Sequence, residues 1–420
     1  MLEIIFLFFI FIFSWNKKIR PLYMFFFLAG YPGLEIMGLK FLHLIIAYFF
    51  IDLLLFKRKL KSPKGLTLFI LFFYLFTALY SILISDASQL IKFVLDLGSF
   101  VILLLLVLTA LDKDYYLKYL EGLVYGIFVS NIITLFAIIF NLPFRDDLFL
   151  ITKEGIRLSG LYGNVNTIAA IQLLSISISL FFIFYYKGKR RLVFLINFFV
   201  AILTLILSQN RSAYLGLAIM LSLLVVLKWK EINLKKITIW LFSVTLILFF
   251  LINTFTNRDI FEGIKLARFS SENTSVSSVG YSDVETQRFF IWGAALETII
   301  ENPLGIGYSN PEIFIKKVTG VNLPSHNFVL SNLLALGIVF GMIMNIIFIY
   351  PVFRISRVRN SGNNLLFFII LGLIGFLTSA LFHTLNNSIY LWIFIIMSYE
   401  LLPVKIKYEK FKNKITSNSK

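Results

Sequence analysis

The segment "LTLILSQNRSAYLGLAIMLSLLVV", residues 203–226, holds two apolar runs on either side of a short polar turn. With the apolar residues that continue each run, both approach the roughly 17 to 25 residues that a helix needs to cross a membrane. The turn leaves Arg211 almost no loop in which its side chain could be solvated, and a cation so near hydrocarbon is costly. The segment therefore predicts two membrane helices joined by a tight turn, whose arginine is a candidate for function.

Apolar runs of similar length recur along the whole chain. Hydrophobic residues form 59% of the 420 residues, charged residues form 15%, and the mean hydropathy is +0.88, so a soluble domain could not bury this much apolar surface. We expect an all-α fold: a polytopic integral membrane protein of about 12 or 13 transmembrane helices. The expected spans are residues 2–14, 19–33, 36–56, 66–84, 90–111, 119–140, 167–186, 192–208, 212–227, 237–255, 326–352, 365–384 and 388–402.

The charge pattern predicts the orientation in the membrane. The net charge is +17, and most of the 39 Lys and Arg residues fall in alternate short loops, which places those loops in the cytoplasm and disfavours nucleic acid as a partner. The chain has no cysteine, which excludes disulfides and thiolate chemistry. The first apolar run lacks the flanks of a cleaved signal peptide, so we expect it to be a retained membrane segment. The basic loops begin at Lys17, Lys57, Lys187, Lys228, Arg354 and Lys405.

By alternation, two long segments lie on the opposite, extracytoplasmic side. Within the second of them, "ETQRFFIWGAALETII", residues 285–300, predicts an amphipathic helix on the membrane surface, with Phe289, Phe290 and Trp292 toward lipid or the bundle. The expected domains are a transmembrane bundle with an external loop at 141–166 (1–255), a large external subdomain (256–325), C-terminal transmembrane helices (326–402), and a basic cytoplasmic tail beside anionic lipid (403–420).

Three arginines are predicted on the external side. Arg157 lies in the turn-rich segment "EGIRLSGLYGNVN", residues 154–166, Arg211 lies in the tight turn, and Arg288 lies on the predicted surface helix. Each has an ordinary alternative as an interfacial, snorkelling or exposed arginine. Three converging guanidinium groups would suit a diphosphate, whose oxygens accept bidentate hydrogen bonds and whose charge needs compensation.

His326 begins the helix that follows the external subdomain, directly after a Pro-Ser pair that favours a helix start. A largely neutral imidazole can accept a proton from a hydroxyl group, although a histidine at a helix start is often structural. His43 and His383 lie within apolar runs, where a structural role is the more common one. No HExxH, DxD or EF-hand spacing occurs, so we assign no metal and no cofactor, although external carboxylates are available at Asp146, Asp147, Asp283 and Glu285.

Four motifs together resemble the O-antigen polymerase and ligase family of bacterial envelope polysaccharide assembly, the Wzy and WaaL group. They are "RLSGLYGNVN" from Arg157, "SQNRSAYLGL" around Arg211, "RFFIWGAALETIIENPLGIGYSN" from Arg288 and "SHNFVLSNLLALGIVFG" around His326. They run in the family's order and cover roughly residues 155–350. Each motif is loose alone, but four in order on a chain of this length are fairly specific.

The resemblance implies a GT-C-like helical fold and an inverting, metal-independent glycosyltransferase at the outer face of the bacterial cytoplasmic (inner) membrane. The implied partners are an undecaprenyl-diphosphate-linked glycan donor, a glycan acceptor and membrane lipid, with a chain-length regulator and a flippase as further partners. By the same resemblance, Arg157, Arg211 and Arg288 bind the donor diphosphate, and His326 orients or deprotonates the acceptor hydroxyl. Weaker candidates for the cavity wall are Tyr162, Asn164, Asn166 and Asn327.

Two departures from the family pattern bear on the activity. Val165 stands where many relatives have proline, and Phe340 stands where the ligase-type loop signature of His326, Asn327 and Gly337 ends in Gly, Thr or Tyr. The chain is rich in Phe, Ile, Lys and Asn, which suggests an AT-rich genome, and some such bacteria lack lipid A. We therefore favour a polymerase of capsular or O-antigen repeat units.

Two other activities stay open. The first is an O-antigen ligase that transfers glycan to lipid A core or another acceptor. The second is a lipid-linked oligosaccharide transporter or flippase, but transporters often show two similar halves and a charged site within the bundle. Candidates at one face beside a single asymmetric loop favour an enzyme. A purely structural membrane protein would leave that clustering unexplained.

Overall fold

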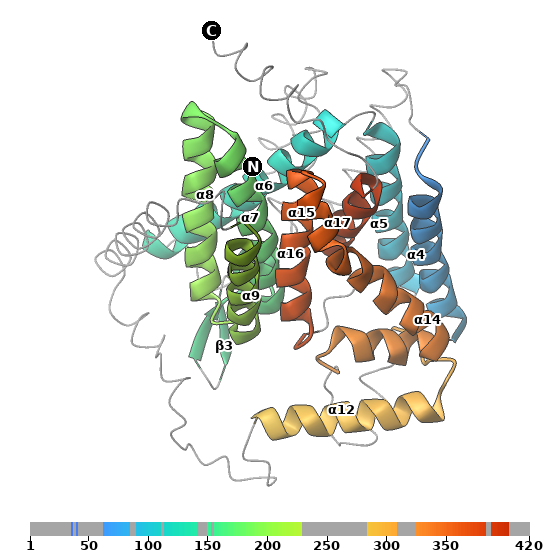
Figure 1. Cartoon of the computed structure of the whole chain (residues 1–420). Coiled ribbons are helices and arrows are strands. Elements are labelled where there is room, and N and C mark those ends of the chain that lie inside the picture. The colour runs from blue at the N-terminus through green and yellow to red at the C-terminus, as the bar shows by residue number, and fades with distance from the viewer. Residues whose placement is uncertain are drawn as a thin grey trace.

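The structure is a computed structural model that describes residues 35–36, 39–40, 62–84, 90–110, 113–140, 149–152, 155–228, 284–308, 325–383 and 388–402. Within these residues the chain is almost entirely helical, which confirms the all-α prediction. Figure 1 shows a bundle of helices with α12 lying across one end. The helices are α4 (Gly65–Ile84), α5 (Leu90–Thr109), α6 (Lys113–Ile139), α7 (Val165–Tyr185), α8 (Gly188–Leu207), α9 (Arg211–Lys228), α12 (Val284–Glu301), α14 (Phe328–Phe353), α15 (Ile355–Asn360), α16 (Asn364–Ala380) and α17 (Ile389–Leu401), with a 3₁₀ turn η3 (Gly160–Tyr162) before α7.

Six of the described helices are long and apolar enough to span a membrane, and α16 and α17 are shorter apolar helices. Their bounds agree with the predicted spans to within a few residues. The prediction for 36–56 is wrong at its start, because Glu35–Ile36 (β1) pairs antiparallel with Leu39–Lys40 (β2). Gly38, between them in the sequence, is a residue type that favours turns. The rest of that span and the predicted spans 2–14, 19–33 and 237–255 lie outside the described residues.

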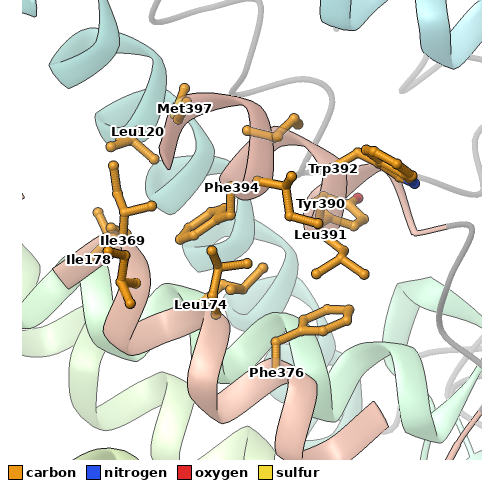
Figure 2. Close-up of a cluster of buried hydrophobic side chains, with 14 of the residues drawn as sticks. Leu120, Leu174, Ile178, Ile369, Phe376, Tyr390, Leu391, Trp392, Phe394 and Met397 are labelled. Carbon is orange, nitrogen blue, oxygen red and sulfur yellow. The ribbon is translucent and has the colours of Figure 1, made fainter. Parts of the chain in front are cut away.

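The core forms around α7, which packs against α8 and α16 and is almost wholly buried. Because lipid tails are as apolar as leucine, helices in a membrane associate through close packing and interhelical hydrogen bonds. Asn131 of α6 and Gln172 of α7 exchange two such bonds, of 2.9 and 3.0 Å. Figure 2 shows the apolar side chains that meet where α6, α7, α16 and α17 pack together, among them Leu120, Leu174, Ile178, Ile369, Phe376, Leu391 and Phe394.

A pair of glycines brings α9 against α16. A Cβ added at Gly216 would lie 2.5 Å from the carbonyl oxygen of Gly375, which is closer than a side chain tolerates. Backbone contact of this kind is typical of membrane helices that pack through small residues. It fixes where the first residue of α9 lies relative to the end of α16.

Replacing Gly216 with alanine is expected to destabilise the protein by about 1–3 kcal/mol, because the new methyl group forces α9 and α16 apart. Gly293→Ala in α12 is the matched control, since its added Cβ meets nothing within 4 Å and alanine is the better helix former. Thermal unfolding of both variants in lipid nanodiscs measures the difference. A Gly216→Ala protein as stable as the Gly293→Ala protein would contradict this packing argument.

The helix α14 is interrupted at Gly337, where the sequence predicts one continuous helix over 326–352. Gly337 has φ 76° and ψ 177°, a conformation outside the helical region that glycine adopts without strain. The two halves fold toward each other, since Asn332 donates to Asn345 (2.8 Å) and Asn345 donates to the carbonyl group of Val329 (3.2 Å). The break removes helical partners from carbonyl groups just before Gly337.

The docking segment, residues Asn302–Tyr308 after α12, supplies the missing partners. A Cβ at Gly305 would lie 2.4 Å from the backbone nitrogen of Gly337, so the docking segment and α14 are in backbone contact at these two glycines. Buried backbone groups are nearly always paired, and here a distant segment pairs them. The backbone hydrogen bonds run from Ile306 N to Leu334 O (2.8 Å), from Gly307 N to Ala335 O (3.0 Å) and from Ile338 N to Pro303 O (2.9 Å).

The docking segment is also tied to the end of α4. The hydroxyl group of Tyr80 donates to the carbonyl oxygen of Leu304 (2.8 Å), and the backbone N–H of Tyr308 donates to Oγ of Ser81 (2.8 Å). The helix α12 itself buries Ile291, Ala295 and Ile299 against α14. The helix α12 and the segment after it are therefore held to α14 and α4.

The two ends of the bundle differ in charge. The start of α8, the end of α9 and α15 lie at one end, whereas α12 and the hairpin of β3 (Phe149–Thr152) and β4 (Gly155–Leu158) lie at the other, called the α12 end below (Figure 1). This arrangement agrees with basic loops on the cytoplasmic side. The first end carries Lys187, Lys189, Arg190, Arg191, Lys228, Arg354, Arg357 and Arg359.

Candidate functional site

Three of the helices that begin at the α12 end are capped by an asparagine. Asn164 caps α7, Asn210 caps α9 and Asn327 caps α14, each by accepting hydrogen bonds of 2.8–3.2 Å from backbone N–H groups of the first turn. The remaining N–H groups and the helix dipole give each helix start a partial positive charge. Helix starts that converge favour an anion between them.

Two residues beside these caps have a left-handed backbone. Gln209 has φ 50° and His326 has φ 49°, and they are the non-glycine residues with positive φ in the described part of the chain. Gln209 directly precedes the cap Asn210, and His326 directly precedes the cap Asn327. Such a conformation costs about 1–2 kcal/mol for most residues and occurs often at functional sites, where the surrounding structure holds it.

Side-chain contacts join the helix starts to the end of α16. The amide nitrogen of Asn210 lies 2.9 Å from Oδ1 of Asn166 and 3.3 Å from Nε2 of His383, which follows α16. The rings of His383 and His326 meet edge to face, with centroids 6.4 Å apart and planes at 87°. These four residues, the His326 cluster, come from four segments that are far apart in the sequence.

The helix α12 helps to place His326. The indole N–H of Trp292 on α12 donates to the carbonyl oxygen of Ser325 (3.0 Å), the residue before His326. The hydroxyl group of Ser325 in turn lies 2.8 Å from that of Ser331 in α14. The predicted helix over 285–300 is confirmed, and Trp292 faces the bundle, whereas the side chains of Phe289 and Phe290 lie outside the described part.

Two of the three predicted arginines lie near the first turn of α9. Arg211 is the first residue of this helix, and its side chain is exposed. A cation at a helix start is unfavourable by about 0.3–1 kcal/mol, so stability does not account for it. Arg157 on β4 lies within electrostatic range of the Tyr214 phenol, which is one turn along α9 from Arg211. Arg211 therefore directly follows Asn210 of the His326 cluster, and Arg157 lies near the side chain of Tyr214 on the same helix.

The structure places the backbone of Arg288 on α12, one turn before Trp292. The side chain of Arg288 lies outside the described part, so its convergence with the other arginines stays a prediction. The carboxylates Asp146, Asp147 and Asp283, together with the side chain of Glu285, also lie outside it. Over the residues that are described, no three His, Cys, Asp or Glu side chains gather as a metal site would require.

The weaker candidates have packing or capping contacts. The ring of Tyr162 meets that of Tyr390 on α17 at 6.3 Å, and burial raises the pKa of the Tyr162 phenol, which keeps it neutral. Asn164 and Asn327 use their side-chain oxygens as helix caps. Asn166 accepts a hydrogen bond from Asn210 and so belongs to the His326 cluster. Their place in a cavity wall stays a prediction.

Sequence reasoning missed His383 and Asn210. His383 lies in an apolar run, and no motif includes it, so its neighbours could not be read from spacing. One signal was available, because the predicted span 365–384 starts on the basic side and therefore ends on the same side as His326. Asn210 directly precedes Arg211, but its role as the link between α7, α9 and α16 depends on long-range contacts.

The departure at Phe340 has a structural explanation. The Phe340 ring packs against rings of α4, with centroids 5.0 Å from Phe76, 5.1 Å from Tyr80 and 6.5 Å from Phe73. Aromatic pairs at these separations add to the burial energy. Phe340 therefore holds the second half of α14 against α4.

The comparisons with known proteins give one family match. Residues 196–346 match the model of the O-antigen ligase family, a range that includes Arg211, Arg288 and His326 and leaves out Arg157 and His383. The comparison with curated proteins gives no match. The matched family consists of membrane enzymes of the O-antigen ligase and polymerase type, which confirms the resemblance inferred from the four motifs. The chain is therefore a multi-pass membrane protein with an O-antigen ligase family domain at residues 196–346.

Proposed function

We propose that the protein polymerises undecaprenyl-diphosphate-linked oligosaccharide repeat units into O-antigen or capsular polysaccharide at the outer face of the bacterial cytoplasmic membrane. The observation that carries this proposal is the His326 cluster, which connects His326 to Asn210, the residue directly before Arg211. A group that can take a proton from a hydroxyl is thus linked, through His383 and Asn210, to the helix start that carries a cation able to bind a diphosphate. The family match supports glycan transfer as the reaction class.

The donor diphosphate binds at the start of α9 in this proposal. Arg211 begins this helix, Arg157 lies near Tyr214 one turn along it, and the proposal adds Arg288 of α12 as the third arginine. Guanidinium groups bind diphosphate oxygens with paired hydrogen bonds, and the starts of α7, α9 and α14 add positive potential. The lipid tail then lies along the apolar bundle, and the glycan extends toward α12.

The reaction is a substitution at the anomeric carbon. The acceptor oxygen forms a bond to this carbon while the bond from the carbon to the diphosphate oxygen breaks, and the electron pair leaves with undecaprenyl diphosphate. The acceptor proton passes to the imidazole of His326. The arginines and helix starts stabilise the charge that develops on the departing diphosphate. A single displacement of this kind inverts the anomeric configuration.

O-antigen ligase is the second candidate, and the description of the matched family favours it. Both transfers use the same donor, and they differ in the acceptor, which is another repeat unit for a polymerase and lipid A core for a ligase. The test is to incubate the purified protein in proteoliposomes with lipid-linked oligosaccharide, with and without lipid A core. A ladder of longer glycans without lipid A core supports the polymerase, and product only in its presence supports the ligase. Translocation of unchanged donor across the bilayer would instead indicate a flippase.

Replacing Arg211 with lysine is expected to weaken binding of undecaprenyl diphosphate about tenfold, because lysine keeps the charge but loses the paired hydrogen bonds. Arg359→Lys on α15, at the opposite end of the bundle, is the matched control and should leave binding unchanged. Titration of undecaprenyl diphosphate into each variant in nanodiscs gives the dissociation constants. Equal affinity in the wild type and the Arg211→Lys protein would show that Arg211 only anchors the helix.

A further inference from the structure

We propose that His383 is a positioning residue that keeps the His326 imidazole at a fixed position relative to the diphosphate-binding start of α9. Asn210 in turn holds His383 in one neutral tautomer. The proposal rests on the function proposed above. It concerns a residue that lies outside the matched family domain and outside all four motifs. Its evidence is the set of contacts that surround Asn210.

The orientation of the Asn210 amide follows from its partners. Its Oδ1 lies 3.0 Å from the backbone N–H of Ala213 and 2.7 Å from the hydroxyl group of Ser212. A backbone N–H can only donate, so the atom that faces Ala213 must be the amide oxygen. The amide NH₂ group therefore points the other way, toward Asn166 and His383.

This orientation fixes the tautomer of His383. One amide hydrogen of Asn210 goes to Oδ1 of Asn166 (2.9 Å), and the other faces Nε2 of His383 (3.3 Å). An NH₂ group has no acceptor to offer, so Nε2 must carry a lone pair, and the proton of the neutral ring is on Nδ1. His383 follows the end of α16, where the helix dipole would favour a charged imidazolium. The hydrogen bond from Asn210 thus favours the neutral ring, whereas the helix dipole favours the charged ring. Such a conflict between two local effects is typical of a residue that is retained for function.

The ring of His383 is then in place to orient His326. The two rings meet edge to face at 6.4 Å, the arrangement that aromatic quadrupoles favour. The backbone of His326 is already held by its left-handed conformation between Trp292-bound Ser325 and the cap Asn327. The contact with His383 restricts the remaining freedom, the rotation of the imidazole.

The same contacts connect the acceptor side of the site with the donor side. His326 touches His383, His383 touches Asn210, and Asn210 caps the helix that begins with Arg211. A base and an anion-binding group must be held within a fraction of an ångström for efficient transfer, and a 1 Å error costs about 100-fold. The position of His326 relative to the diphosphate therefore depends on His383.

The kinetic test uses His383→Gln in the full-length protein in proteoliposomes. Glutamine can still accept the hydrogen bond from Asn210, so it preserves that stabilising contact, but it removes the ring that touches His326. We expect kcat to fall about 10- to 100-fold with little change in the donor KM. In a His326→Ala background the same substitution should cause no further fall, because His383 acts through His326. An unchanged kcat, or an equal fall in both backgrounds, would overturn the proposal.

The spectroscopic test uses the fact that the chain has only three histidines. With ¹⁵N-labelled histidine, solid-state NMR of the membrane-embedded protein should show His383 with protonated Nδ1 and unprotonated Nε2. Asn210→Asp keeps the cap but replaces the NH₂ donor by an acceptor, so Nε2 of His383 should become protonated. A protonated Nε2 in the wild type, or the same His383 spectrum in both proteins, would refute the assignment.

The two tests separate this proposal from the function on which it rests. The kinetic test uses as its donor the lipid-linked oligosaccharide that accumulates in host cells from which the gene has been deleted. If the wild type transfers no glycan from this donor to any acceptor, the proposed function fails, and the NMR experiment still decides the contact between Asn210 and His383. If the wild type is active and His326→Ala is not, the His383→Gln result decides the positioning role alone.

Discussion

Replacing His326 with alanine is expected to lower the rate of glycosyl transfer by about 100- to 10,000-fold, because the acceptor hydroxyl loses the group that takes its proton. The donor remains bound, since the arginines near α9 are unchanged, so the affinity for undecaprenyl diphosphate should stay close to that of the wild type. Single-turnover transfer in proteoliposomes, with the protein in excess over donor, measures rates over this range.

Two further variants control this experiment. His326→Asn introduces a residue type that adopts the left-handed backbone readily, so a loss of activity in this variant cannot arise from backbone strain. His43→Ala removes a histidine that no motif includes, and it should leave the rate unchanged. Wild-type polymer length from the His326→Asn protein would rule out His326 as the catalytic base.

Replacing Gly337 with alanine is expected to have the largest effect on the fold. The added Cβ would lie 2.4 Å from the carbonyl carbon of Leu304 and 2.5 Å from the carbonyl oxygen of Pro303, and neither backbone atom can move alone. The clash costs about 1–3 kcal/mol, and an alanine at φ 76° and ψ 177° adds further strain, because this backbone conformation is essentially restricted to glycine. The docking segment should detach from α14, which releases α12 and the contact of Trp292 with Ser325. Transfer should then fall about 100-fold through loss of alignment.

Gly362→Ala is the matched control for this variant. Gly362 has φ 70°, close to the 76° of Gly337, but an added Cβ there meets nothing within 4 Å. Gly362→Ala thus places an alanine at positive φ without a clash, whereas Gly337→Ala adds the clash and a φ/ψ pair that is essentially restricted to glycine. Thermal unfolding in nanodiscs and proteolysis of α12 compare the two. If Gly337→Ala were no less stable and no more susceptible to proteolysis than Gly362→Ala, the docking of α12 through this glycine would be disproved.

The spans of the described helices could be predicted because membrane insertion depends on local composition. The apolar runs that flank Arg211 became α8 and α9, and the polar turn between them became the start of a helix. Hydropathy could not reveal the break in α14, since the residues around Gly337 are as apolar as those of an intact helix. The break is stable because Ile306 and Gly307, about 30 residues earlier in the chain, satisfy the freed carbonyl groups.

The candidate site was only partly predictable, because the local sequence marks some of its residues and long-range contacts mark the others. Motif order identified His326 and Arg211, because each stands at a polar border of an apolar run, where a charged or titratable group needs an explanation. His383 gave no such signal, and its importance comes from ring contact with a residue 57 positions earlier. The left-handed backbone of His326 also depends on caps and on Trp292, which sequence spacing does not encode.

The docking segment has a consequence for how this protein could diversify. Its three hydrogen bonds to α14 join main-chain atoms alone, so they do not depend on which side chains the segment has, provided that Gly305 and Gly337 are kept. Side chains around this segment can then change without moving α12, which positions Ser325 through Trp292. The main-chain contacts thus allow the surface of the α12 end to vary in its chemistry while the arrangement of the helix starts beneath it stays constant.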